Sequence, residues 1–129
     1  MSTTRKIIAT KNAPAAVGPY SQGVQVGNMV YTAGQVPLVP ATGKLVSDDV
    51  AAQTRQSMEN VAAVLEAAGT SLANVVKTTI FVTDISQFGT VNEVYGSFFA
   101  SDPPARSTVQ VAALPLGAQV EIEAVAILA

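Results

Sequence analysis

The amino-acid sequence predicts an α+β fold in which two helices pack on one face of a mixed β-sheet. The first observation is the order of periodic segments along the chain: strand, hairpin, helix, strand, helix, strand, strand. The second is that strand–helix–strand crossovers favour parallel neighbours, whereas the two hairpin-like pairs favour antiparallel ones. The third is the length, because 129 residues are enough for one domain with a real core (residues 1–129) but not for two.

Three short strands are predicted in the first third of the chain. Residues 6–10 have a β-like pattern that ends before Pro14. Residues 21–26 and 29–33 are two further β-like runs, and the dipeptide between them, Gly27-Asn28, is typical of a two-residue hairpin turn. A loop is expected next, where three turn-forming residues follow: Pro37, Pro40 and Gly43.

Two helices are predicted on either side of a central strand. The first opens at residues 47–49, whose acidic groups suit a helix N-terminus, and ends at Gly69. Residues 75–83 are rich in β-branched side chains and predict the central strand. Asp84 or Ser86 is expected to cap the second helix. The two glycines within this helix weaken the prediction, because each lowers helix stability by about 1 kcal/mol relative to alanine. The apolar faces of the two helices are Val50, Thr54, Met58, Val61 and Leu65, and then Phe88, Val91, Tyr95 and Phe98 or Phe99.

The two closing strands are predicted at residues 106–112 and 119–128, after the break at Asp102 and two prolines. Side chains alternate along the last strand, and both of its faces are largely apolar, so we expect both to be covered. Two helices can cover only one face. We therefore expect a partner subunit on the other, in line with a charged fraction of 12 % against about a quarter in typical domains. The two faces are Val120, Ile122, Ala124 and Ala126, and Glu121, Glu123, Val125 and Ile127.

Composition excludes several classes of function. The chain has a net charge of −2 and no basic cluster, which argues against nucleic acid as a partner. It lacks cysteine and histidine, which removes disulfides, Cys–Zn sites, thiol nucleophiles, the usual general base and any Ser-His-Asp triad. No uncharged apolar run approaches the roughly 20 residues of a membrane-spanning helix. No secretory signal is recognised, and a cytoplasmic protein is expected.

Arg106 is the one cation between residues 78 and 129, and it lies in an apolar strand where a charge is costly unless it is paired or functional. One interpretation is a structural ion pair with Glu121 or Glu123. The other is a clamp that binds a substrate carboxylate bidentately and leaves a glutamate free for chemistry. A carboxyl group in apolar surroundings exchanges protons closer to neutral pH, whereas a glutamate on a solvated edge strand would not.

Three weaker candidates complete the set. Tyr20 ends a tight turn that presents its phenol, Gly34 would let a ligand approach the backbone closely, and Asn92 falls near the apolar face of the second helix. Each also has a structural interpretation, which is packing for the tyrosine, a bulge for the glycine and a helix–sheet hydrogen bond for the asparagine.

Motifs spread from about residue 6 to the C-terminus carry a family resemblance. They are residues 12–23, Thr32 to Gln35, Ala52 to Gln56, Val76 to Thr79, Pro104 to Ser107 and Val120 to Ala124. Together they resemble the RidA family (reactive intermediate deaminase A, also called YjgF). The resemblance implies a fold like that of the chorismate mutase of bacilli, assembled as a homotrimer with sites between subunits. It also implies metabolite damage control, in which 2-imino acids such as 2-iminobutanoate and 2-iminopropanoate are hydrolysed to 2-keto acids and ammonia without cofactor or metal.

The resemblance also implies roles for individual residues. Arg106 would bind the substrate carboxylate, Glu121 would orient or activate water, and Tyr20 of a neighbouring subunit would border the pocket. Gly34 and the backbone of Thr108 would contact the substrate, and Asn92 is a further substrate-binding candidate. Many members carry cysteine where this chain has Thr108.

Because Thr108 replaces this cysteine, a second function is also considered, that of a trimer that binds small carboxylates or has a regulatory role without catalysis. A third function, ribonuclease activity or inhibition of translation, is attached to some relatives of this family. It is opposed here by the absence of histidine and of a basic patch.

Overall fold

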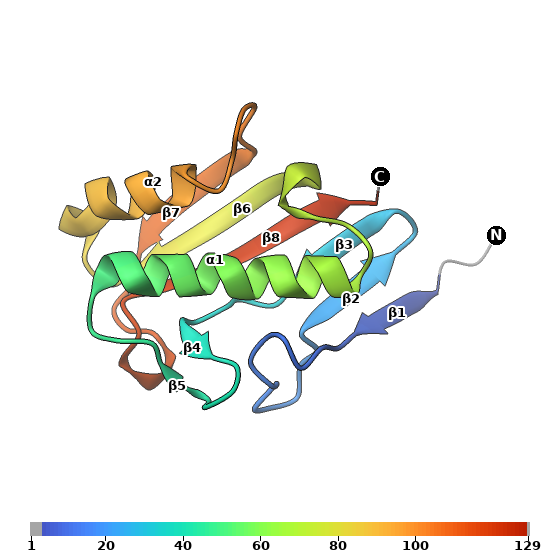
Figure 1. Ribbon diagram of the computed structural model, residues 1–129, viewed down its shortest axis with the longest axis horizontal. Coiled ribbons are helices and arrows are strands. Elements are labelled where there is room, and N and C mark those ends of the chain that lie inside the picture. The colour runs from blue at the N-terminus through green and yellow to red at the C-terminus, as the bar shows by residue number, and fades with distance from the viewer. Residues whose placement is uncertain (1–3, 129) are drawn as a thin grey trace.

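The computed structural model describes residues 4–128 and shows two helices on one face of a six-stranded mixed sheet (Figure 1). Residues 1–3, which belong to the segment considered for a secretory signal, and Ala129 lie outside the described residues. The predicted fold class is therefore confirmed. The elements are β1 Arg5–Ile8, β2 Gly23–Val26, β3 Met29–Thr32, β4 Leu38–Val39, β5 Lys44–Leu45, α1 Val50–Ala67, η1 Leu72–Asn74, β6 Val75–Val82, η2 Ile85–Gln87, α2 Phe88–Gly96, β7 Ala105–Gln110, η3 Pro115–Gly117 and β8 Val120–Ile127.

The strand order is β1-β2-β3-β8-β6-β7, which differs from the prediction at one point. The β6–α2–β7 crossover gives parallel neighbours as predicted, and β1, β2 and β3 pair in antiparallel fashion. The two closing strands, however, are not a hairpin pair. β8 is inserted between β3 and β6, antiparallel to both, whereas β7 takes the edge beside β6. Burial explains this order, because all but the last residue of β8 are buried or partly buried, which suits the middle of the sheet, while most of β7 is exposed.

The helix boundaries follow the predicted signals. The carboxylate of Asp49 caps α1 by accepting from the backbone N–H of Ala52 at 2.9 Å, and Gly69 ends the helix with a φ of +91°. Asp84 accepts from the N–H of Ser86 at 3.0 Å and starts η2, which runs directly into α2. The segment predicted as a loop contains the small β4–β5 hairpin, too short to leave a periodic pattern.

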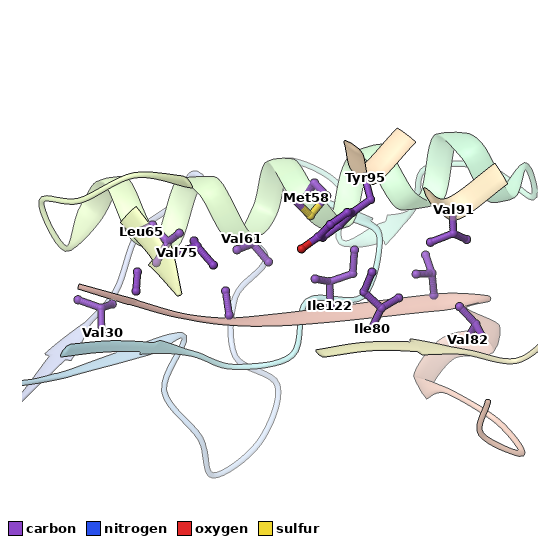
Figure 2. Packing of buried hydrophobic residues seen from close by; sticks show 13 residues of the cluster. Val30, Met58, Val61, Leu65, Val75, Ile80, Val82, Val91, Tyr95 and Ile122 are labelled. Carbon is purple, nitrogen blue, oxygen red and sulfur yellow. The ribbon is translucent and has the colours of Figure 1, made fainter. Parts of the chain in front are cut away.

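The core lies between the helices and the sheet (Figure 2). Met58, Val61 and Leu65 of α1 are fully buried, as is Ile122 at the centre of β8. Tyr95 reaches from α2 toward the sheet in the same layer (Figure 2). The predicted division of β8 into two faces is found, and the face that packs against the helices is the one with Val120, Ile122, Ala124 and Ala126, which are at most 2 % exposed. This layer fixes which side chains of β6 and β8 point toward the helices and which point away.

The opposite side of the sheet, here called the open face, carries neither α1 nor α2, which both lie on the near side of the sheet in Figure 1. The pairing register places Tyr31 beside Val125, and Val109 beside Phe81, all on this face. Tyr31 is 46 % exposed and Val109 is 43 % exposed. Exposed apolar side chains on a sheet face are typical of an interface, so the expected partner subunit stays a prediction that the fold favours. No helix among the described residues is both long and apolar enough to cross a bilayer.

Candidate active site

Arg106 lies on β7 and points toward the helices. Its register partner on β6 is Thr78, which is 1 % exposed within the helix-facing layer. The guanidinium carbon is 5.4 Å from the ring centroid of Phe88 and 5.2 Å from that of Tyr95, both on α2. Arg106 is therefore held between the edge strand of the sheet and the second helix.

Two further polar side chains share this location. Asn92 stands between Phe88 and Tyr95 on the same face of α2, and Thr108 follows Arg106 by two residues on the same face of β7. Asn92 Oδ1 and Thr108 Oγ1 are both buried without a hydrogen-bond partner. The predicted helix–sheet hydrogen bond of Asn92 is thus not formed by this oxygen. Since buried polar atoms are nearly always bonded, the two oxygens require a partner from outside the chain, such as a ligand, a further subunit or water. Arg106, Asn92 and Thr108 are here called the arginine half-site.

Glu121 lies on β8 and points to the open face. Its register partner is Phe81, and its neighbour Ile122, on the opposite face, is fully buried in the core. Burial raises the pKa of the Glu121 carboxyl above its ordinary value, and the nearby charge of Glu123 raises it further. The group therefore exchanges protons closer to neutral pH than a solvated glutamate does, as expected of a catalytic carboxyl.

Gly34 lies directly against this carboxyl. An antiparallel bridge, in which Gln35 N–H donates to the Ile122 carbonyl at 2.7 Å, brings the end of the β3 segment beside β8. A Cβ placed on Gly34 would lie 2.8 Å from Glu121 Cδ and closer still to its Oε2. The predicted close approach at Gly34 is therefore made by the chain's own Glu121, and its contact with substrate stays a prediction.

A cavity of about 460 Å³ opens in front of Glu121 and Gly34. Tyr20 lines it and is 49 % exposed, with its hydroxyl accepting from the backbone N–H of Val17 at 3.3 Å. The rest of the lining is mainly apolar and includes Leu116, which has a left-handed backbone with a φ of 60°. Glu121, Gly34 and Tyr20 are here called the glutamate half-site.

The two half-sites of one chain face opposite sides of the sheet. On β6, Thr78, Ile80 and Val82 point to the helices, whereas Phe81 points to the open face. Arg106 pairs with Thr78, and Glu121 pairs with Phe81. The structural ion pair considered for Arg106 with Glu121 or Glu123 is therefore wrong within one chain. The guanidinium and these carboxylates can meet only if one of them belongs to another copy.

Phe88 and Tyr95 are functional candidates that the sequence interpretation missed. The sequence assigns both to the apolar face of the second helix. This is correct for Tyr95, whose exposed fraction is 4 %, and only partly correct for Phe88, whose exposed fraction is 37 %. Their separation of seven residues, two helical turns, on the helix that leads into the arginine strand is the signal that could have revealed them. Within residues 4–128 there is no group of three or more His, Cys, Asp or Glu side chains that could hold a metal ion.

Replacing Gly34 by alanine is expected to reduce kcat by about ten-fold or more while the protein stays folded. The added Cβ would overlap the Glu121 carboxyl, which must then move by the order of an ångström, and such a shift is costly for a group that is expected to act on water. Steady-state kinetics and thermal unfolding measure the two effects. Gly96→Ala, where a Cβ meets nothing within 4 Å and the backbone is not left-handed, is the control for a glycine lost elsewhere. Unchanged kcat in Gly34→Ala would contradict this close packing.

Comparisons with known proteins give a consistent result. The family model described as Endoribonuclease L-PSP matches residues 10–128. A 2-iminobutanoate/2-iminopropanoate deaminase of Escherichia coli K12 is 55 % identical over 125 residues, covering 95 % of this chain and 97 % of the relative. The human protein of the same name is 50 % identical and covers 98 % of this chain and 92 % of the relative. A crystal structure of E. coli TdcF with bound serine superposes with a TM-score of 0.91 at 50 % identity, covering 95 % of this chain and 98 % of that one.

Proposed function

The chain belongs to the Endoribonuclease L-PSP family, and we propose on that premise that it hydrolyses 2-imino acids such as 2-iminobutanoate and 2-iminopropanoate. The observation that carries this proposal is 55 % identity over nearly the whole chain to a deaminase of that name, and the predicted resemblance to the RidA family is confirmed by it. The family description names a nuclease. A chain with no histidine and a net charge of −2, however, is better suited to imine hydrolysis than to RNA cleavage.

The active enzyme is proposed to be a homotrimer in which the arginine half-site of one subunit meets the glutamate half-site of the next. Three observations support it: the half-sites face opposite ways, the open face exposes apolar side chains such as Tyr31 and Val109, and two buried oxygens of the arginine half-site lack partners. A contact between two different surfaces of identical chains forms a ring when the rotation closes. Each of three such contacts would then contain one Arg106 and one Glu121 from different subunits.

The chemistry needs few groups. Arg106 binds the substrate carboxylate through two parallel N–H donors, and water then attacks the carbon of the imine, whose nitrogen is protonated. As the C–O bond forms, the Glu121 carboxylate takes a proton from that water and returns it to the amino nitrogen of the tetrahedral adduct. The C–N bond then breaks, the hydroxyl proton leaves as the ketone forms, and ammonia carries it away. Water, a carboxyl and a guanidinium are sufficient, so no metal or organic cofactor is required.

The compartment is proposed to be the cytoplasm. An imino acid hydrolyses spontaneously in water, so a protein that accelerates this reaction must share a compartment with the enzymes that release the imine. The resemblance to the RidA family implies that the enzymes that release the imine are pyridoxal-phosphate-dependent dehydratases.

The direct test couples this protein to a threonine dehydratase that generates 2-iminobutanoate in situ, with semicarbazide competing for the imine. We expect faster formation of 2-ketobutyrate and less semicarbazone. Binding of 2-ketobutyrate without any acceleration would contradict the deaminase and favour a carboxylate-binding protein.

Co-expression tests the shared site. Arg106→Ala and Glu121→Gln subunits, each nearly inactive alone, are expected to give mixed trimers with about a third of the wild-type activity, because in a ring that contains both kinds of subunit only one of the three sites receives a normal Arg106 and a normal Glu121. Differently tagged subunits allow the mixed trimers to be purified before assay. Activity no higher than that of the separate variants would contradict a site built from two subunits.

A further inference from the structure

The guanidinium of Arg106 is held over two aromatic rings, those of Phe88 and Tyr95, here called the aromatic cradle. The distances from the guanidinium carbon to the ring centroids are 5.4 and 5.2 Å. The rings are seven residues apart, two turns of α2, and therefore project from the same side of the helix. Both distances lie within the range of an attractive cation–π contact.

Tyr95 is itself fixed from several sides. Its ring is 4 % exposed, its hydroxyl lies 2.7 Å from Thr78 Oγ1, and the ring of Phe99 packs 5.0 Å away. Thr78 is also the register partner of Arg106, so one residue of β6 aligns both the arginine strand and the ring over its guanidinium. Burial raises the pKa of Tyr95, and the ring is therefore neutral in the physiological range.

Contacts with ring faces leave donors of the guanidinium available. Arginine carries five N–H donors in the plane of its fork, and a carboxylate binds along that plane. Within the chain, Glu121 and Glu123 lie on the other face of the sheet and take none of these donors. We infer that Phe88 and Tyr95 are positioning residues that orient Arg106 for the carboxylate of the substrate, an inference that rests on the proposed function.

The test is a double-mutant cycle on the dissociation constant of 2-ketobutyrate, measured by NMR titration, with imine kinetics beside it. Tyr95→Leu is expected to raise Kd and KM by about ten-fold while kcat changes by less than about three-fold. In an Arg106→Ala background the same change is expected to alter Kd by less than about two-fold, because its effect passes through the guanidinium. Tyr95→Phe keeps the ring and is expected to keep most of the affinity, although it removes the bond to Thr78.

Phe88→Leu provides a second test in case the Tyr95 variant fails to fold. Phe88 is 37 % exposed, so its loss should raise Kd without unfolding the core. Phe98→Leu is the matched control, since the ring of Phe98 lies against a different cation, with its centroid 6.0 Å from the guanidinium carbon of Arg55, and its loss should leave Kd unchanged. Two results would overturn the inference but leave the proposed function intact. One is that Tyr95→Leu changes Kd equally with and without Arg106, and the other is that both Tyr95→Leu and Phe88→Leu keep normal affinity. Normal affinity in Arg106→Ala would overturn the proposed role of Arg106 and the inference together.

Discussion

Replacing Arg106 by alanine is expected to raise the KM for 2-iminobutanoate by about a hundred-fold, with a smaller loss in kcat. Two charge-assisted hydrogen bonds to the substrate carboxylate disappear, which together correspond to about 3 kcal/mol of binding. The folded state should tolerate the change, because Arg106 lies on an edge strand and the described carboxylates of its own chain on β8 face away from it. Steady-state kinetics with imine generated in situ, and thermal unfolding, separate the two effects.

Two variants make this experiment specific. Arg106→Lys keeps the positive charge but lacks the planar fork, so its KM should fall between those of wild type and Arg106→Ala. Arg55→Ala removes another arginine that lies over an aromatic ring, 6.0 Å from the centroid of Phe98, and should leave KM unchanged. A change of less than about three-fold in Arg106→Ala would rule out Arg106 as the carboxylate-binding residue.

Replacing Glu121 by glutamine is expected to lower kcat by about a hundred-fold to a thousand-fold, with little effect on KM. The amide has nearly the same shape, but it cannot take a proton from the attacking water, and general-base catalysis contributes factors of this size. Glu123→Gln is the natural control, because Glu123 lies two residues away on the same face of β8. If Glu121→Gln retained most of its kcat, water activation would have to be assigned to another group.

The raised pKa of Glu121 gives this prediction a dependence on pH. The base form is needed, so kcat/KM should fall with decreasing pH through a value above the ordinary carboxyl pKa, and the fall should be absent in Glu121→Gln. Removing the charge of Glu123 should move the fall toward lower pH. A carboxyl whose pKa is raised by folding binds more protons in the folded state, so it lowers the unfolding free energy as pH rises from its unfolded to its folded pKa. Glu121→Gln should therefore be at least as stable as wild type at neutral pH, which thermal unfolding can check.

The local elements of the fold were predictable because their signals are local. The cap at Asp49, the stop at Gly69 and the alternation along β8 all come from neighbouring residues, and each is found in the structure. The place of β8 between β3 and β6 could not be predicted in this way. It depends on which strand of the whole sheet gains most from burial on both faces, a comparison that no single segment contains.

The same limit applies to the candidate site. The sequence identifies Arg106 and Glu121 as chemically informative, but whether they share a face depends on two pairing registers, β7 with β6 and β6 with β8. A shift of one residue in either register would reverse the answer. The contact of Gly34 with Glu121 has the same origin, since it depends on an isolated bridge between Gln35 and Ile122, residues that are far apart in the chain.

The two-sided character of β8 has a consequence for how the protein can vary. Its even-numbered positions, 120 to 126, fill the core, while two of its odd-numbered positions carry carboxylates on the open face. The even-numbered positions of β8 thus serve folding and the odd-numbered carboxylates serve the proposed chemistry, so almost no position of β8 is left on which neutral substitutions could accumulate. Genetic drift should instead be concentrated in the solvent-exposed side of α1 and in the tips of the surface turns, where a substitution affects neither constraint.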